Sequence, residues 1–184
     1  MLLLNAALGE PDRALLENVY RQFRNAMYFE AYSVTENSED AEDAVHEVFL
    51  RIARKHMSTL ARLSEENKLK YYLLSAVRNT ALNLTRTAGS KNEVPTDPDD
   101  LNEAGLSDED FVDRLSDALD AGELVVNIRE LKPIYRDVLY QRFVLGLSVK
   151  EIADLGRLPR ATVRKRILRG KQLLLKMYEE KSHE

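Results

Sequence analysis

Apolar side chains recur every three or four positions along most of this 184-residue chain, which is the spacing of amphipathic helices rather than of strands. Two segments in the first half carry this pattern, and their apolar stripes are Leu15, Val19, Phe23, Ala26 and Met27, and then Ala41, Ala44, Val45, Val48, Phe49 and Ile52. We expect a bundle of four helices over 10–87, which includes a further long helix over 69–87, and three or four more helices over 123–180. The pattern therefore predicts an all-α fold.

The helical pattern stops between residues 88 and 106, where Pro, Gly, Asp and Asn are frequent and few apolar side chains remain to form a core. Helical spacing returns with Phe111, Leu115 and Leu119, which indicates a short helix over 107–122 that could dock on either neighbour. We therefore expect two small helical domains, 10–87 and 123–180, joined by a linker at 88–122.

Helix-end signals place a helix-turn-helix motif in the second domain. Ser148 and Glu151 have the S-x-x-E spacing of a capping box, so a helix should begin near Ser148. Gly156 can take the left-handed conformation that ends it, and Pro159 suits the first turn of the next helix. A helix of about seven residues, a short turn and a second helix is typical of this DNA-binding motif. In the first domain, Ser38 is the expected N-cap of the second helix.

Charge is strongly segregated along the chain, although the net charge is only −4. Residues 89–127 hold twelve acidic and two basic side chains, a net charge of −10, which leaves +6 for the remainder. Residues 157–176 hold eight basic side chains and no acidic one. The acidic stretch indicates a solvated spacer that repels DNA, and the basic stretch indicates a surface for a polyanion.

The expected second helix of the motif divides into an apolar and a basic face at 100° per residue. Its buried stripe should be Val163, Ile167, Gly170 and Leu174, and the residues opposite or beside it are Arg160, Ala161, Thr162, Arg164, Lys165, Arg166 and Arg169. Like charges four residues apart repel in an isolated helix, and nearby phosphates would relieve that repulsion. We therefore expect this face to bind duplex DNA in the major groove, the alternative being a basic helix face without a ligand.

Other chemistries find little support in the composition. There is no cysteine, which suits a reducing cytoplasm, and only three histidines are present. His46 and Glu47 resemble the start of a zinc-protease motif, but Leu50 stands where a second histidine is required. No phosphate-binding glycine loop or nucleophile motif occurs. We expect no enzyme activity, no metal, no other cofactor, no signal peptide and no membrane insertion.

Two stretches resemble bacterial RNA polymerase sigma factors of the extracytoplasmic-function group of the sigma-70 family. "NIRELKPIYRDVLYQRFVLGLSVKEIADLGRLPRATVRKRILRGKQLL" is similar to their region four, and "DAEDAVHEVFLRIARK" with "LKYYLLSAVRNTALNLTR" is similar to their region two. The matched segments keep the family's order on the two sides of a variable linker. His46 and Asn83 replace the family's usual Gln and Asp, and the turn glycine lies one position early.

The resemblance implies a promoter-specificity subunit that binds core RNA polymerase, through the clamp helices of its largest subunit and the flap of the second largest. It implies that residues 10–87 also capture the melted −10 element, and that 123–180 reads the duplex −35 element. The implied polymerase contacts are Asp43, His46, Glu47 and Leu50. The implied −10 contacts are Lys70, Tyr71, Tyr72, Arg78, Asn79, Asn83 and Arg86.

Regulation by an anti-sigma factor is also expected from the resemblance. The alternative function is an operator-binding helix-turn-helix regulator whose first half is a helical dimerisation or sensor domain. An interaction-only helical protein would leave the basic segment 157–176 without a purpose.

Overall fold

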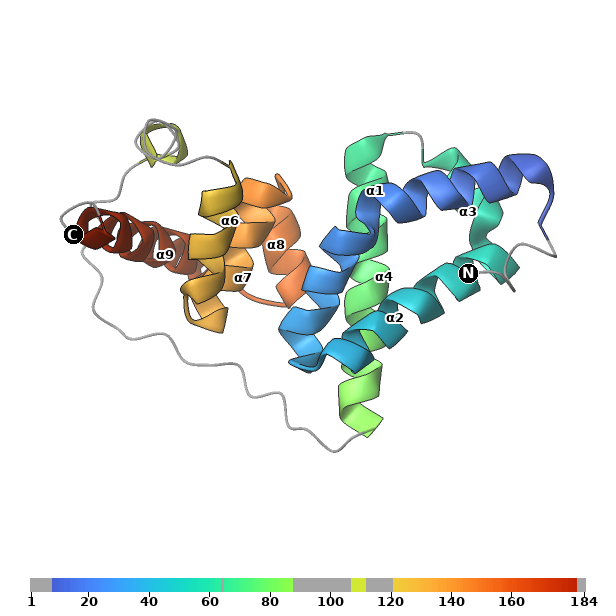
Figure 1. Ribbon diagram of the computed structural model, residues 1–184, viewed down its shortest axis with the longest axis horizontal. Helices are drawn as coiled ribbons and strands as arrows, with labels where there is room; N and C mark the ends of the chain where they lie inside the picture. Colours follow the sequence, from blue (N-terminus) through green and yellow to red (C-terminus); the bar gives the residue numbers. More distant parts are fainter. Residues whose placement is uncertain (1–7, 64, 88–106, 112–120, 182–184) are drawn as a thin grey trace. The chain divides into compact units, whose positions relative to one another are not determined.

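The structure of the chain is a computed structural model, and the residues that it describes are 8–63, 65–87, 107–111 and 121–181 (Figure 1). It divides into two compact units, 1–92 and 93–184. No residue in these described ranges lies in a strand, so the predicted all-α fold is confirmed. The linker expected at 88–106 lies outside the described residues.

The first unit is built from three long helices that pack on one another, α1 (Glu10–Thr35), α2 (Ser38–Arg51) and α4 (Glu66–Thr87). A single π-helical turn, η1 (Ile52–His56), and the short α3 (Met57–Arg62) connect α2 to α4. All six residues of the apolar stripe predicted for the second helix are buried. On α1 the stripe is Leu16, Val19, Phe23 and Met27, so Leu15 was the wrong member of the leucine pair and is only half-buried, as is Ala26.

The N-cap of α2 is Asn37 rather than Ser38. Asn37 Oδ1 accepts hydrogen bonds from the amides of Glu39 and Asp40 at 2.8 and 3.2 Å. Asn and Ser cap helices equally well, and the helix already begins at Ser38, so the prediction was one residue late. Glu39 and Asp40 in the first turn interact favourably with the helix dipole.

The second unit consists of α6 (Ala121–Glu130), α7 (Pro133–Leu139), the π-helical segment η2 (Tyr140–Val144), α8 (Val149–Gly156) and α9 (Arg160–Lys181). The predicted stripe of α9 is confirmed, because Val163, Ile167, Gly170 and Leu174 are all buried. Gly170 lets α9 approach α7 closely: a Cβ added there would lie 2.7 Å from Leu139 Cδ1.

Residues 107–111 belong to the second unit, which answers the question of where this segment docks. Residues 108–111 are helical, and Ser107 Oγ accepts a hydrogen bond from the amide of Asp110 at 3.0 Å. Phe111 is fully buried, and its ring centroid lies 4.9 Å from that of Phe143 in η2. The rest of the helix expected up to residue 122 falls partly outside the described residues, and α6 begins at Ala121.

Candidate nucleic-acid interface

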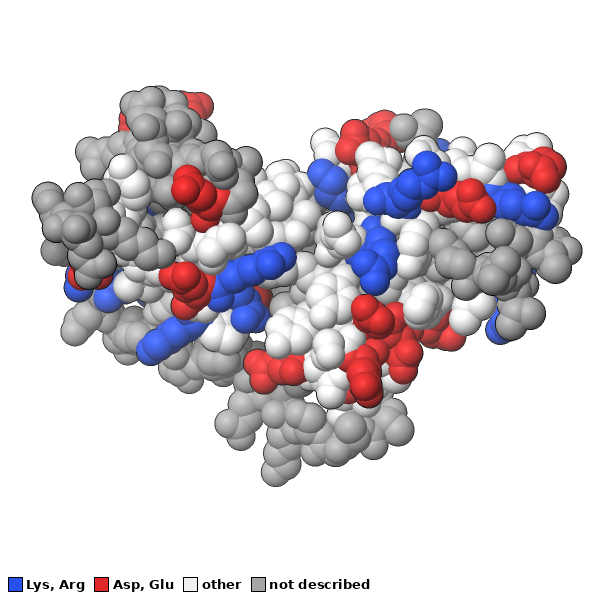
Figure 2. All heavy atoms as spheres, viewed as in Figure 1, with Lys and Arg blue, Asp and Glu red and all other residues white. Residues whose placement is uncertain are grey.

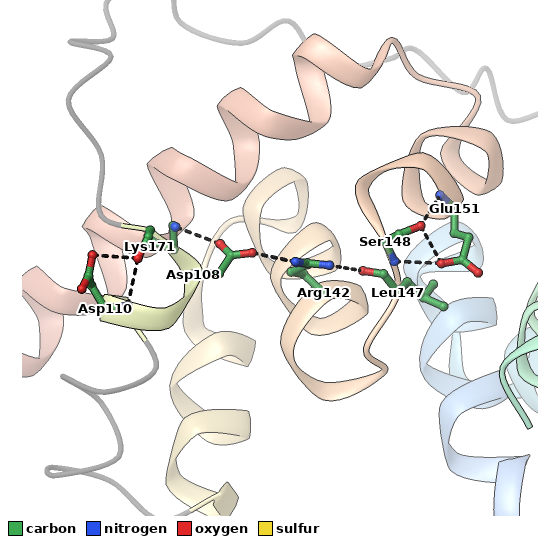
Figure 3. A network of polar contacts seen from close by, with 8 residues as sticks. Asp108, Asp110, Arg142, Leu147, Ser148, Glu151 and Lys171 are labelled. Carbon is green, nitrogen blue, oxygen red and sulfur yellow. Dashed lines mark hydrogen bonds and ion pairs between the residues drawn. The ribbon is translucent and has the colours of Figure 1, made fainter.

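The helix-turn-helix is formed by α8 and α9, and its first helix has the predicted capping box. Ser148 Oγ accepts from the amide of Glu151 at 3.2 Å, and the Glu151 carboxylate accepts from the amide of Ser148 at 2.8 Å (Figure 3). These two bonds satisfy amides that the helix itself leaves without partners. The side chains of Ser148 and Glu151 therefore determine where α8 begins.

The turn between the two helices differs from the prediction by one residue. The left-handed residue is Arg157, with φ 52°, whereas Gly156 is the last residue of α8. The Leu158 amide donates to the Ala153 carbonyl at 2.9 Å, which closes the helix end. Pro159 lies immediately before α9, and its carbonyl accepts from the Val163 amide. The connection between the helices is still short, because α8 includes Gly156 and α9 begins at Arg160.

The outward face of α9 carries the basic residues that the sequence indicated. Arg160, Ala161, Arg164, Lys165 and Arg169 are exposed, and Thr162 is half-buried. Arg169 Nη1 donates to Gln172 Oε1 at 3.3 Å on the same helix. This surface presents guanidinium and ammonium groups from the second helix of the motif, which is the element that enters the major groove in such folds.

Arg166 does not share that exposure, and the prediction that it contacts DNA is at odds with its position. Its exposed fraction is 6%. It lies three residues after Val163 and four before Gly170, so it is on the edge of the buried stripe. Its guanidinium therefore belongs to the interior of the unit.

A polar network that sequence reasoning missed joins the segment before α6 to the helix-turn-helix (Figure 3). Asp108 Oδ1 accepts from Lys171 Nζ at 2.9 Å, and Asp108 Oδ2 accepts from Arg142 Nε at 2.9 Å. Arg142 Nη1 donates to the Leu147 carbonyl at 3.0 Å. The network thus reaches the residue that precedes the Ser148 N-cap.

The pKa of Asp108 reflects two opposing effects. Partial burial raises it, but the hydrogen bonds and positive charges of Lys171 and Arg142 together outweigh burial and place the pKa below its ordinary value. Asp108 is therefore ionised at neutral pH and held by two cations.

In the same unit, burial raises the pKa of Tyr140, and the charge of Arg129 opposes that effect.

In the first unit, the predicted polymerase contacts lie along one face of α2. Asp43, His46 and Glu47 are exposed and Leu50 is half-buried. Figure 2 shows acidic side chains gathered around this helix, and the exposed acids on it or just before it are Glu36, Glu39, Glu42, Asp43 and Glu47. Glu47 pairs with Arg51 at 3.4 Å. The face is acidic and open to a basic partner.

The residues expected to contact single-stranded DNA lie on α4, but not all are equally available. Asn79, Asn83 and Arg86 are exposed, and Lys70, Tyr71 and Tyr72 are half-buried. Arg78 Nη1 instead donates to Glu30 Oε1 at 2.7 Å, and Glu30 is fully buried. Arg78 therefore has a structural role in joining α4 to α1, which counts against a direct DNA contact.

The described residues offer neither a metal site nor a membrane span. No group of three or more His, Asp or Glu side chains in the described ranges could hold a metal ion. No helix within those ranges is both long and apolar enough to cross a membrane.

Comparison with known proteins identifies both units. The family described as "Sigma-70 region 2" matches residues 19–91, and "Sigma-70, region 4" matches residues 123–174. The chain is 26% identical over 158 residues to "ECF RNA polymerase sigma factor SigE" of Mycolicibacterium smegmatis, covering 86% of this chain and 59% of that protein. It is also 26% identical over 164 residues to "ECF RNA polymerase sigma factor SigM" of Bacillus subtilis, covering 89% and 94%.

A solved structure has a similar fold. It is the sigma factor RpoE in complex with the anti-sigma factor NepR from Bartonella quintana, with a TM-score of 0.50 and 19% sequence identity over 87% of this chain and 96% of that one.

Proposed function

Since the chain belongs to the extracytoplasmic-function group of the sigma-70 family, we propose that it binds core RNA polymerase and directs it to a set of promoters. The chemistry of transcription takes place in the polymerase, so this chain supplies recognition and no catalytic residue. The cytoplasm, where the polymerase acts, is the expected location.

The exposed basic face of α9 is the observation that carries this function. Arg160, Ala161, Arg164, Lys165 and Arg169 face solvent on the second helix of a helix-turn-helix. Arginine can bond two acceptors on guanine in the major groove, while the neighbouring cations neutralise phosphates. We therefore assign −35 recognition to this face, with Thr162 at its edge and without Arg166.

The surface of α4 suits the melted −10 strand. Half-buried Tyr71 and Tyr72 offer rings for stacking, and Lys70 and Arg86 offer charge for the backbone. Asn79 and Asn83 lie one turn apart on the exposed face and can bond base edges. In this proposal Arg78 does not contact DNA, and its ion pair with Glu30 holds α4 against α1.

The acidic face of α2 suits the clamp helices of the largest polymerase subunit. Charge complementarity of this kind accelerates association and selects the partner. The flap of the second largest subunit is the expected partner of the second unit. The structure with a similar fold is bound to an anti-sigma factor, which supports an anti-sigma protein as a regulator of this chain as well.

The alternative of an operator-binding regulator is not favoured. Its first half would be a sensor or dimerisation domain, whereas residues 19–91 match sigma-70 region 2. Both halves of the chain therefore point to the same polymerase-bound function.

Run-off transcription from genomic fragments, with purified core polymerase and the full chain, tests the proposal. We expect initiation at a limited set of sites only when the chain is added. Core polymerase that initiates equally with and without the chain would contradict the proposal.

The polymerase contact can be tested separately by reversing one charge. Asp43→Lys should weaken binding to core polymerase about ten-fold, and more at low salt than at high salt. Glu17→Lys reverses the same charge on α1 and should leave that affinity unchanged. Equal affinities of the two variants would remove the α2 face from the interface.

A further inference from the structure

Asp108 is shared by two cations from different helices of the second unit. Lys171, one residue after the glycine of α9 that packs on α7, donates to Oδ1 at 2.9 Å. Arg142 in η2 lies on Oδ2, with Nε at 2.9 Å and Nη2 at 2.8 Å. Because these two atoms lie on the same carboxylate oxygen, the orientation of the guanidinium is fixed as well as its charge.

The turn that carries Asp108 is anchored by burial in addition to charge. Phe111 is fully buried against Phe143, and Lys171 Nζ lies 5.7 Å from the centre of the Phe111 ring. The Lys171 side chain is only 6% exposed. The Asp108 side chain is 36% exposed, so solvent and salt screen this ion pair in part, although less than they screen the surface pairs of this chain.

Arg142 also bonds to the backbone just before the first helix of the helix-turn-helix. Its Nη1 donates to the Leu147 carbonyl at 3.0 Å, and the Leu147 amide donates to the Gln141 carbonyl at 2.9 Å. Leu147 lies between Gly146, whose φ is +69°, and Ser148, the N-cap of α8. The path from Asp108 to Leu147, the residue before the N-cap of α8, therefore consists of two hydrogen-bonded steps (Figure 3).

We propose that Asp108 is a positioning residue for duplex recognition: by holding Arg142 and Lys171 together it fixes how α8 and α9 are presented to DNA. This inference rests on the proposed function of the second unit. In this proposal the acidic segment before α6 takes part in DNA recognition in addition to linking the two units.

Two roles of Asp108 predict opposite changes in DNA affinity when its negative charge is removed. If Asp108 acted only through long-range charge, Asp108→Asn would strengthen DNA binding, because one source of repulsion is lost. If Asp108 positions the motif, the same variant should weaken binding, about five-fold, although the chain has become less acidic. The salt dependence should stay unchanged, because no phosphate contact is removed.

The experiment compares polymerase holoenzymes containing the full chain on a promoter found by run-off transcription. Glu109→Gln removes the same charge from an exposed position in the same turn and should leave affinity unchanged or slightly raised. Asp108→Glu should recover most of the affinity lost by Asp108→Asn. Affinity that rises or stays constant in Asp108→Asn would overturn the inference.

A second measurement decides the inference without DNA or polymerase. In the free full chain, hydrogen exchange of the amides at the start of α8 should accelerate at least ten-fold in Asp108→Asn. Arg142→Lys should show the same acceleration, because one ammonium group cannot reproduce the paired bonds to Asp108 together with the bond to Leu147.

Unchanged exchange at Ser148–Glu151 in both variants would overturn the positioning role, whatever the holoenzyme does. A wild-type chain that fails to direct polymerase would instead refute the proposed function, and the exchange result would still decide whether Asp108 orders the motif.

Discussion

Glu30 and Arg78 form a buried ion pair that joins α1 to α4, with 2.7 Å between Glu30 Oε1 and Arg78 Nη1. The Glu30 side chain is fully buried and that of Arg78 is 21% exposed. Removing one member of such a pair is far more costly than replacing both, because the remaining charge stays buried. Loss of either member alone should therefore lower the stability of the first unit strongly.

Arg78→Ala should lower the free energy of unfolding by about 3 kcal/mol. Replacing both residues, Glu30→Met with Arg78→Met, should cost less than Arg78→Ala alone, because no buried charge is left. Arg86→Ala, on the exposed side of the same helix, should change stability by less than about 0.5 kcal/mol. Urea unfolding of the full chain, followed by circular dichroism, measures all three, and equal losses for Arg78→Ala and Arg86→Ala would contradict this assignment.

Gly170→Ala should destabilise the second unit by about 1–3 kcal/mol, even though alanine is the better helix former. The added Cβ would lie 2.7 Å from Leu139 Cδ1 and 2.9 Å from Leu139 Cγ, and Leu139 is itself fully buried. Gly156→Ala is the matched control, because its nearest contact would be 3.3 Å away, on the side chain of Leu158. Thermal unfolding of the two variants compares them, and a Gly170→Ala variant as stable as wild type would show that α9 can shift away from α7.

Arg164→Ala or Lys165→Ala should each weaken holoenzyme binding at the −35 element by about 1–3 kcal/mol. Loss of a phosphate contact should also lower the salt slope by about one, whereas loss of a base contact should relax the sequence preference. Lys176→Ala, an exposed residue nearer the end of α9 that pairs with Glu180 at 3.7 Å, should have little effect. Equal transcription from the cognate promoter with all three variants would remove this face from DNA recognition.

Acidification should weaken the second unit through Asp108. Because its pKa is lower in the folded chain than in the unfolded one, the stabilisation is fully present above the unfolded-state value of about 4 and is lost as pH falls through the folded-state pKa. Wild type should exceed Asp108→Asn in unfolding free energy by about 1 kcal/mol near pH 7, and the difference should shrink below about pH 4. Urea unfolding from pH 7 to 3 measures it, and a constant difference would contradict the ion-pair origin.

Local rules in the sequence predicted the helices and their ends closely. The capping box of Ser148 and Glu151 and the stripe from Val163 to Leu174 were both correct, because each depends on residues within four positions of one another. The choice between Leu15 and Leu16 was missed, since both fit a 3.6-residue period and only packing selects one. Arg157 in the left-handed turn was missed for a similar reason, because the position of the helix end decides it.

Long-range pairing was not predictable from the same rules. Glu30 and Arg78 are 48 residues apart, and Asp108 and Lys171 are 63 apart. Each of these side chains looks like an ordinary surface charge in its own segment, and periodicity cannot indicate which charges meet. Lys171 and Arg166 were counted with the basic segment, yet both are buried.

The contacts of Phe111 and Asp108 place the start of the second unit upstream of α6. Phe111 is fully buried and lies against Phe143, and Asp108 pairs with Arg142 and Lys171. A fragment that begins at Ala121 would lose both contacts. An isolated second unit should therefore begin at or before Ser107 if it is to keep the stability that it has in the intact chain.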